Sequence, residues 1–255
     1  MSVNQNDIST HRKSRRLSMK RACLILASVI ILSAAAFLIY AEQYSHADES
    51  AYSALDSDET VSVEQTEYGW FFDGPSETDA LIFYPGAKIE EEAYAPLLRL
   101  FAEQGMDVCL VRMPFRFAFF DLDKADQVMS QHAYTRWYIG GHSLGGAMAA
   151  RYAPGHSSEL AGVVLLAAYP TVSLKDGLRV ITIYGSEDRI LNRTRLAEGR
   201  RFLPADSAEY VIEGGNHAQF GSYGMQKGDG TARISPEEQQ HRTVALVLGR
   251  ILPEV

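Results

Sequence analysis

From residue 67 onward, short apolar segments of the chain alternate with longer segments of helical periodicity. Several of the short segments are β-branched and apolar on both faces, which is typical of buried strands in a parallel sheet. The alternation therefore predicts an α/β fold with a mostly parallel central sheet and helices on both faces. We expect strands at Tyr68–Phe72, Ala80–Tyr84, Asp107–Arg112, Arg136–Ile139, Gly162–Ala167, Arg179–Tyr184 and Glu209–Ile212, and helices near 91–104, 123–131, 144–152, 194–203 and 236–252.

The composition is that of one folded domain with appendages. Of the 255 residues, 46% are hydrophobic and 22% charged, which suits a domain of roughly 200 residues with a core of its own. The two cysteines, Cys23 and Cys109, exclude a disulfide framework and a cysteine-rich zinc site. Residues 1–21 carry a net charge of +5 and the remainder −13. Since phosphate binding requires clustered Lys and Arg, the acidic body argues against a nucleic-acid partner.

Twenty uncharged residues, from Ala22 to Ala41, follow the basic N-terminal tail. As a helix they would span ~30 Å, the thickness of a bilayer hydrocarbon core. We interpret residues 22–41 as a transmembrane signal anchor of the cell membrane, with the tail at 1–21 in the cytoplasm and the remaining chain outside. A cleaved signal peptide, which would make the protein secreted, stays an alternative, because Ala34 and Ala36 could form a cleavage site.

Residues 42–66 are acidic and polar. Such a segment cannot bury enough apolar surface to fold alone, so we expect a linker there, although its later part could pair as a first edge strand. The folded domain is then expected at 67–255.

The strongest chemical signal is the motif Gly141-His142-Ser143-Leu144-Gly145. It lies between a predicted strand and a predicted helix, which is the context in which G-x-S-x-G presents a nucleophilic serine on a sharp turn. Ser143 would stand at a helix N-terminus, where backbone amides favour negative charge. The alternative is an ordinary glycine-rich turn with a capping serine.

Serine requires a general base, and the base requires an acid that orients it. His217 follows the last predicted strand in a glycine-rich loop, whereas His156 lies in a loop at the opposite end of the sheet and His142 lies inside the motif itself. We therefore predict His217 as the base. Asp188 follows the preceding strand and is the predicted acid, with Glu187 as the alternative.

An oxyanion hole should complete the site, with one amide from the residue after the nucleophile and one from the loop after an earlier strand. Leu144 is the first donor. Ala87, after the Pro85-Gly86 turn, is the predicted second donor, and a plain turn is the alternative. A further loop on the same side, at 112–117, could line an acyl pocket or only pack against the body of the protein.

These segments together resemble the α/β-hydrolase superfamily, and more narrowly a group of small, lidless, mostly bacterial members with undefined substrates. The resemblance covers about residues 68–252 and is specific for the fold and the triad but not for the substrate. It rests on the runs Phe83–Gly86, Gly141–Gly145, Tyr184–Asp188, Gly215–Phe220 and Gly224–Gly230.

The sequence thus predicts a membrane-anchored serine hydrolase, most simply a carboxylesterase that cleaves a small-molecule or lipid-like ester through an acyl-enzyme. No metal or organic cofactor is expected. Two functions of other kinds remain as alternatives: an acyltransferase that uses the same triad, and a catalytically silent, membrane-tethered binding domain.

Overall fold

The computed structural model contains one eight-stranded sheet, in which the strand order is β1-β2-β4-β3-β5-β6-β7-β8. It describes residues 5–251, and side chains from residue 20 onward. The strands β3 to β8 all run parallel, and β1 and β2 form an antiparallel extension at one edge. The strands are β1 (Ser62–Gln65), β2 (Gly69–Asp73), β3 (Asp79–Tyr84), β4 (Asp107–Val111), β5 (Arg136–His142), β6 (Leu160–Leu166), β7 (Arg179–Gly185) and β8 (Ser207–Ile212). The predicted α/β fold with a mostly parallel central sheet is confirmed.

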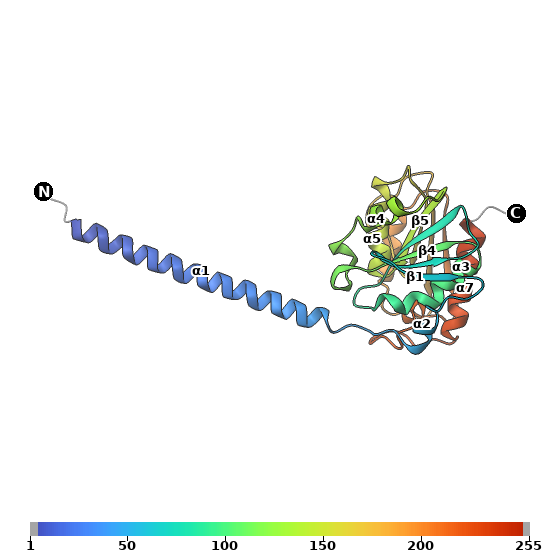
Figure 1. Cartoon of the computed structure of the whole chain (residues 1–255), viewed down its shortest axis with the longest axis horizontal. Helices are drawn as coiled ribbons and strands as arrows, with labels where there is room; N and C mark the ends of the chain where they lie inside the picture. The colour runs from blue at the N-terminus through green and yellow to red at the C-terminus, as the bar shows by residue number, and fades with distance from the viewer. Residues whose placement is uncertain (1–4, 252–255) are drawn as a thin grey trace. The chain divides into compact units, whose positions relative to one another are not determined.

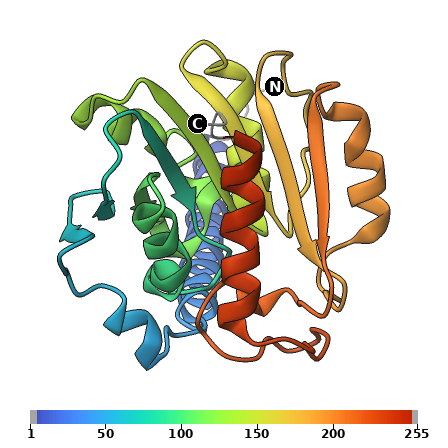
Figure 2. The ribbon, with the colours of Figure 1, turned by 90° about the vertical axis from the view of Figure 1, so that its right-hand side faces the viewer.

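Helices cover both faces of this sheet, as the alternating side chains of β3 illustrate. Leu81 and Phe83 belong to the apolar core beneath α3 and α7, which lie next to each other (Figure 2). Ile82 and Tyr84, which point to the opposite face, belong to the core beneath α4 and α5. The helices are α3 (Ala95–Glu103), α4 (Lys124–Gln131), α5 (Leu144–Tyr152), α6 (Arg193–Gly199) and α7 (Pro236–Ile251). The predicted end of the last helix, Leu252, lies outside the described residues.

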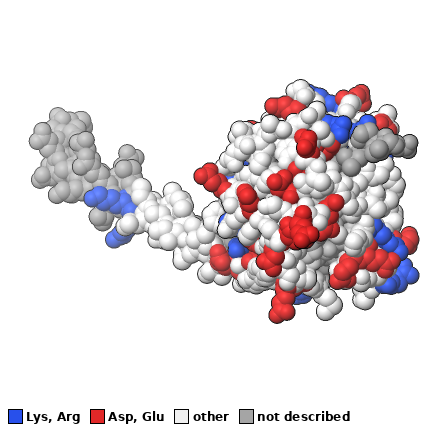
Figure 3. All heavy atoms as spheres, turned by 45° about the vertical axis from the view of Figure 1, so that its right-hand side comes forward, with Lys and Arg blue, Asp and Glu red and all other residues white. Residues whose placement is uncertain are grey.

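The chain divides into two compact units, Met1–Gln43 and Tyr44–Val255 (Figure 1). The first consists of one long helix, α1 (Gln5–Ala41). Its segment Lys20–Ala41 has a mean hydropathy of 2.8 and is long and apolar enough to cross a membrane. Figure 3 shows basic side chains immediately before the uncharged run Ala22–Ala41 and scattered acidic side chains over the visible face of the second unit.

The second unit begins earlier than the sequence predicts, because much of the expected linker at 42–66 is folded. Asp48 caps a short helix, α2 (Glu49–Ser53), by accepting a hydrogen bond from the Ala51 amide, and Ala51 is fully buried. The later part of the segment forms the edge strand β1. These pieces are too short and polar to fold alone, but they dock on a domain that already has a core.

Candidate active site

The nucleophile motif forms a strained turn between β5 and α5. Ser143 adopts φ 53° and ψ −120°, a left-handed backbone conformation that is costly for a residue other than glycine. A Cβ at Gly141 would lie 2.4 Å from the Tyr84 carbonyl oxygen, and one at Gly145 would lie 2.1 Å from the same atom. Glycine is therefore required on both sides of Ser143, because β3 ends against the turn. This is the steric reason for the G-x-S-x-G spacing.

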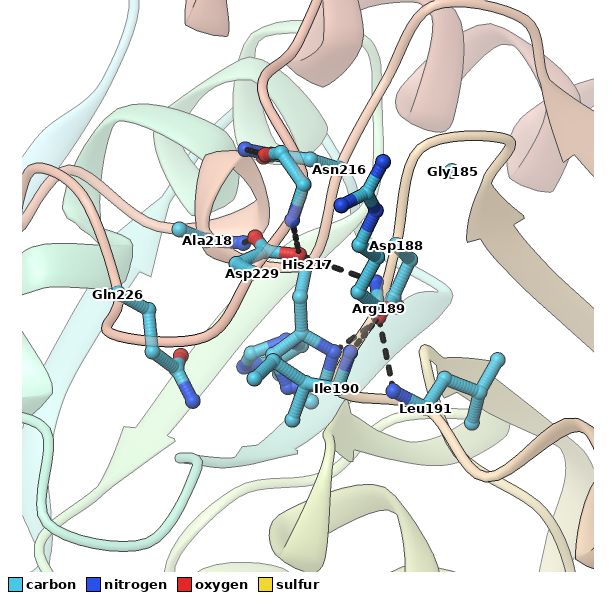
Figure 4. Close-up of polar contacts among 12 residues, drawn as sticks. Gly185, Asp188, Arg189, Ile190, Leu191, Asn216, His217, Ala218, Gln226 and Asp229 are labelled. Atoms are coloured by element: carbon cyan, nitrogen blue, oxygen red, sulfur yellow. Dashed lines mark hydrogen bonds and ion pairs between the residues drawn. The ribbon is translucent and has the colours of Figure 1, made fainter.

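The predicted base and predicted acid meet at the ends of neighbouring strands. His217 follows β8 and Asp188 follows β7, and His217 Nδ1 lies 2.9 Å from Asp188 Oδ2 (Figure 4). His217 is 1% exposed and Asp188 5%. The second carboxylate oxygen of Asp188, Oδ1, accepts the backbone amides of Ile190 and Leu191 at 2.9 and 2.8 Å. The carboxylate is therefore fixed by backbone on one side and faces the imidazole with the other.

Glu187, the alternative acid, has a different partner. Its carboxylate lies 2.6 Å from the guanidinium of Arg233, which is a surface side chain. His156, the other loop histidine, stacks on Tyr152 at the C-terminal end of α5 and lies 3.4 Å from Asp126. Of the acids and bases weighed from the sequence, the structure brings together Asp188 and His217.

One cavity of about 240 Å³ connects the serine and the histidine. Its lining comes from four parts of the chain: the start of α5, the segment after β6, the loop after β7, and the loop after β8. The lining residues are Ser143, Leu144, Ala147, Ala167, Ala168, Tyr169, Ile190, Leu191, Asn192 and His217. A larger cavity, of about 450 Å³, lies on the other side of the His217 loop and does not include Ser143. We take the smaller cavity as the candidate active site, because both Ser143 and His217 line it, whereas neither lines the larger cavity.

The predicted oxyanion donors lie on the two segments that meet at the turn. Leu144 is the first residue of α5, so its amide precedes the hydrogen-bond ladder of the helix. Ala87 is half-buried and is not among the residues that line the Ser143 cavity. A Cβ at its neighbour Gly86 would lie 2.7 Å from the Tyr94 hydroxyl oxygen, so a larger residue there would displace the Tyr94 side chain.

His142 has surroundings that the sequence did not indicate. It is fully buried, and its ring lies 4.4 Å from the ring of His217, centroid to centroid. The Tyr94 hydroxyl oxygen accepts the Gly86 amide at 3.0 Å and lies 2.8 Å from His142 Nδ1. Burial lowers the pKa of His142 well below its usual value, and the neighbouring His217 lowers it further. His142 is therefore a neutral ring that packs behind the base, and Tyr94 connects it to the loop of Gly86.

A second residue missed from the sequence, Asp229, joins the loops of the acid and the base. Its Oδ2 accepts the Ala218 amide at 2.9 Å, and its Oδ1 accepts the Arg189 amide at 3.2 Å (Figure 4). On the other side of the base, buried Gln239 of α7 exchanges two hydrogen bonds with the backbone of Asn216, at 2.9 and 2.8 Å. The loop that carries His217 is thus held from two directions. Among the side chains that the structure describes, those of residues 20–251, no group of three or more His, Cys, Asp or Glu could hold a metal ion.

Comparisons with known proteins agree with this architecture. The model of the alpha/beta hydrolase family matches residues 80–241. No curated protein matches the chain. Among solved structures, Est1E from Butyrivibrio proteoclasticus has a TM-score of 0.54 at 13% identity, and the match covers 76% of this chain and 100% of Est1E. Carboxylesterase CesB from Bacillus subtilis has a TM-score of 0.52 at 10% identity, covering 79% and 95%.

A third structure covers more of the chain. It is described as a membrane phospholipase A, a novel bacterial virulence factor, and has a TM-score of 0.57 at 12% identity. The match covers 94% of this chain and 100% of the other. At these identities, the three structures establish a common fold.

Proposed function

Because this chain belongs to the alpha/beta hydrolase family, we propose that it is a serine hydrolase that cleaves carboxylic esters through an acyl-enzyme. The proposal is supported by a serine at positive φ that opens onto the same cavity as a histidine bonded to a buried carboxylate. This is the arrangement that activates a serine hydroxyl for attack on a carbonyl carbon.

In the proposed reaction, Ser143 Oγ attacks the carbonyl carbon of the ester while His217 Nε2 takes the serine proton. Asp188 accepts the Nδ1 hydrogen of His217, which keeps Nε2 free to act as the base, and stabilises the imidazolium that forms. The amides of Leu144 and Ala87 are the proposed donors to the oxyanion. His217 then protonates the leaving alcohol. In the second half of the reaction, His217 takes a proton from a water molecule, the water attacks the acyl carbon, and Ser143 leaves and receives the proton back from His217. The reaction needs no cofactor.

Ser143→Ala tests this proposal. The variant should fail to react with a fluorophosphonate probe, and its kcat on p-nitrophenyl esters should fall by at least ~10³, since only binding and the oxyanion donors would remain. A panel of p-nitrophenyl esters of increasing chain length would define the acyl pocket. Near-normal esterase activity in Ser143→Ala would rule the proposal out.

We also propose that Lys20–Ala41 anchors the enzyme in the cell membrane, with the unit Tyr44–Val255 outside. The 22-residue span supports this, because its last twenty residues, Ala22–Ala41, are uncharged and follow a basic sequence. The match to the structure described as a membrane phospholipase A covers 94% of this chain, which is more than the unit Tyr44–Val255 alone could account for. The matched region therefore includes part of the first unit.

Membrane sedimentation tests the anchor. Full-length protein should remain with the membrane fraction in carbonate and in high salt, because burial of apolar surface rather than charge holds it there. A mature protein that begins after residue 36 or 41 and is found in the medium would instead identify a cleaved signal peptide.

A further inference from the structure

The loop after β4 exposes a cluster of aromatic side chains. Phe115, Phe119 and Phe120, here called the aromatic patch, are 46%, 49% and 48% exposed. Their rings are close together, with centroids 5.6 Å apart for Phe115 and Phe120 and 4.5 Å apart for Phe119 and Phe120. Phe117 is buried beneath them. Single exposed apolar residues are ordinary, but a contiguous cluster indicates an interaction surface.

The aromatic patch lies at the carboxyl end of the parallel strands, which is also where Ser143 lies. Because β4, β3 and β5 run parallel, the loops that follow them emerge at this same end of the sheet. The Tyr84 hydroxyl, at the end of β3, donates to the Leu122 carbonyl at 2.7 Å and so fixes the loop of the patch beside the nucleophile turn. The short helix Ala118–Phe120 also packs against α5.

The same loop is bonded to the first residues of the compact unit. Lys88 donates its amide to the Arg116 carbonyl at 3.0 Å, and Ser45 donates its amide to the Lys88 carbonyl at 2.8 Å. The Arg116 guanidinium lies 3.3 Å from the centre of the Tyr44 ring. Tyr44 follows Ala41, the last residue of the candidate span, by three residues, and three extended residues reach at most ~11 Å.

The backbone under the patch is held in an unusual conformation. Phe115 and Arg116 have φ values of 53° and 60°, in the left-handed region that bulky residues rarely adopt. Hydrogen bonds on both sides retain it, from the Arg116 amide to the Met113 carbonyl at 3.0 Å and from the Lys88 amide to the Arg116 carbonyl. A conformation of this cost persists where its surroundings determine it, which is common at sites of function. The patch is thus presented by a fixed loop.

We propose that the aromatic patch inserts into the interfacial layer of the lipid bilayer and holds the end of the sheet at which Ser143 lies against the membrane. The proposal rests on the membrane anchor proposed above, since the anchor brings Tyr44 to the bilayer. Phenylalanine side chains are suited to this layer, where apolar rings are buried beside polar headgroups. An enzyme docked in this way would receive acyl substrates from the bilayer, without a separate lid or carrier.

Insertion of the patch is driven by apolar burial and not by charge. Residues 44–255 contain 18 basic and 30 acidic side chains, a net charge of −12. Such a body is repelled by anionic lipid, so zwitterionic phosphatidylcholine should serve at least as well as an anionic lipid. This distinguishes the patch from a basic surface that binds anionic headgroups.

Full-length protein in phosphatidylcholine nanodiscs tests the docking. Phe119→Trp adds a fluorophore to the patch, and Val211→Trp, on the opposite edge strand β8, is the matched control, since Val211 is 43% exposed. Bromine on the lipid acyl chains should quench the added fluorescence at 119 at least tenfold more strongly than that at 211, relative to the native tryptophans. Equal quenching at the two positions, or quenching at 119 only with anionic lipid, would overturn the proposal.

The two proposals fail in different ways. Protein that elutes apart from the nanodiscs would show that the anchor is absent, and both proposals would fall. Protein that stays with the nanodiscs after a high-salt wash but shows no quenching at 119 would retain the anchor and refute only the docking. Fluorophosphonate labelling of the same samples reports on Ser143 independently of either result.

Discussion

Replacing Asp188 by asparagine removes one charge at the centre of the candidate site while keeping the shape of the side chain. The carboxylate oxygens have separate partners: Oδ1 accepts two backbone amides, from Ile190 and Leu191, and Oδ2 faces His217 Nδ1 at 2.9 Å. An asparagine keeps the two backbone bonds only if its carbonyl oxygen takes the place of Oδ1. Its NH₂ group then faces His217.

An NH₂ group cannot accept a hydrogen bond from Nδ1–H. The imidazole of His217 should therefore change tautomer and carry its hydrogen on Nε2, the nitrogen that must accept the proton of Ser143. In a Ser-His-Asp triad the same substitution lowers kcat by about 10⁴, which corresponds to a rise of about 5.5 kcal/mol in the activation free energy. The free energy of unfolding should change far less, because the two bonds to the loop backbone persist.

The measurement is kcat for a soluble p-nitrophenyl ester, with urea unfolding as the check on the fold. Glu187→Gln is the matched control one residue away, since Glu187 pairs with Arg233 and not with the histidine. We expect Asp188→Asn to fold and to lose about four orders of magnitude in kcat, and Glu187→Gln to stay close to wild type. A folded Asp188→Asn enzyme with normal kcat, or a larger loss in Glu187→Gln, would refute this reasoning.

Two further predictions concern the residues around the triad. Gly145→Ala should unfold more easily than wild type and lose probe labelling, because its Cβ would lie 2.1 Å from a backbone oxygen. Gly249→Ala in α7 is the control: a Cβ there meets nothing within 4 Å, so this variant should be more stable than wild type by about 0.5–1 kcal/mol. Burial and His217 hold the pKa of His142 well below 6.5, so the folded chain keeps this ring neutral where the unfolded chain protonates it. The resulting stability is present above about pH 6.5 and is lost as the pH falls below it, by at most ~1.4 kcal/mol per pH unit. Below pH 6.5, the urea midpoint should therefore depend less steeply on pH in His142→Gln than in wild type, and equal slopes in the two proteins would contradict the prediction.

The fold was predictable from the sequence because its elements are local and repeat. Each parallel strand is a short apolar run, and the steric demands of the nucleophile turn require glycines two residues before and after Ser143. The order serine, acid, base along the chain then reduced seven histidines to one expected base. The acid was narrowed to two neighbouring carboxylates, and only the geometry of the loop separates Asp188 from Glu187.

What the sequence could not indicate depends on contacts between distant segments. The acidic stretch that contains α2 reads as a linker, because its folding depends on a surface that other residues supply. Asp229 lies in the run Gly224–Gly230 that contributes to the family resemblance, but neither it nor Gln239 had a predicted role. Their roles are recognisable only once the loops after β7 and β8 and the helix α7 are side by side. His142 has the same explanation, since its neighbour His217 is 75 residues further along the chain.

The geometry of the acid and base is set by backbone contacts between the two loops that carry them. The amide of Ser186 donates to the Ile212 carbonyl at 3.0 Å, and that of Glu187 donates to the Gly215 carbonyl at 2.8 Å. This approach requires Gly185, where a Cβ would lie 2.2 Å from the Gly215 oxygen. Because these bonds continue the pairing of β7 with β8, the sheet itself positions the Asp188 and His217 loops, without any contribution from Ser143. Ser143→Ala should therefore remove the nucleophile and leave the hydrogen bond between Asp188 and His217 in place.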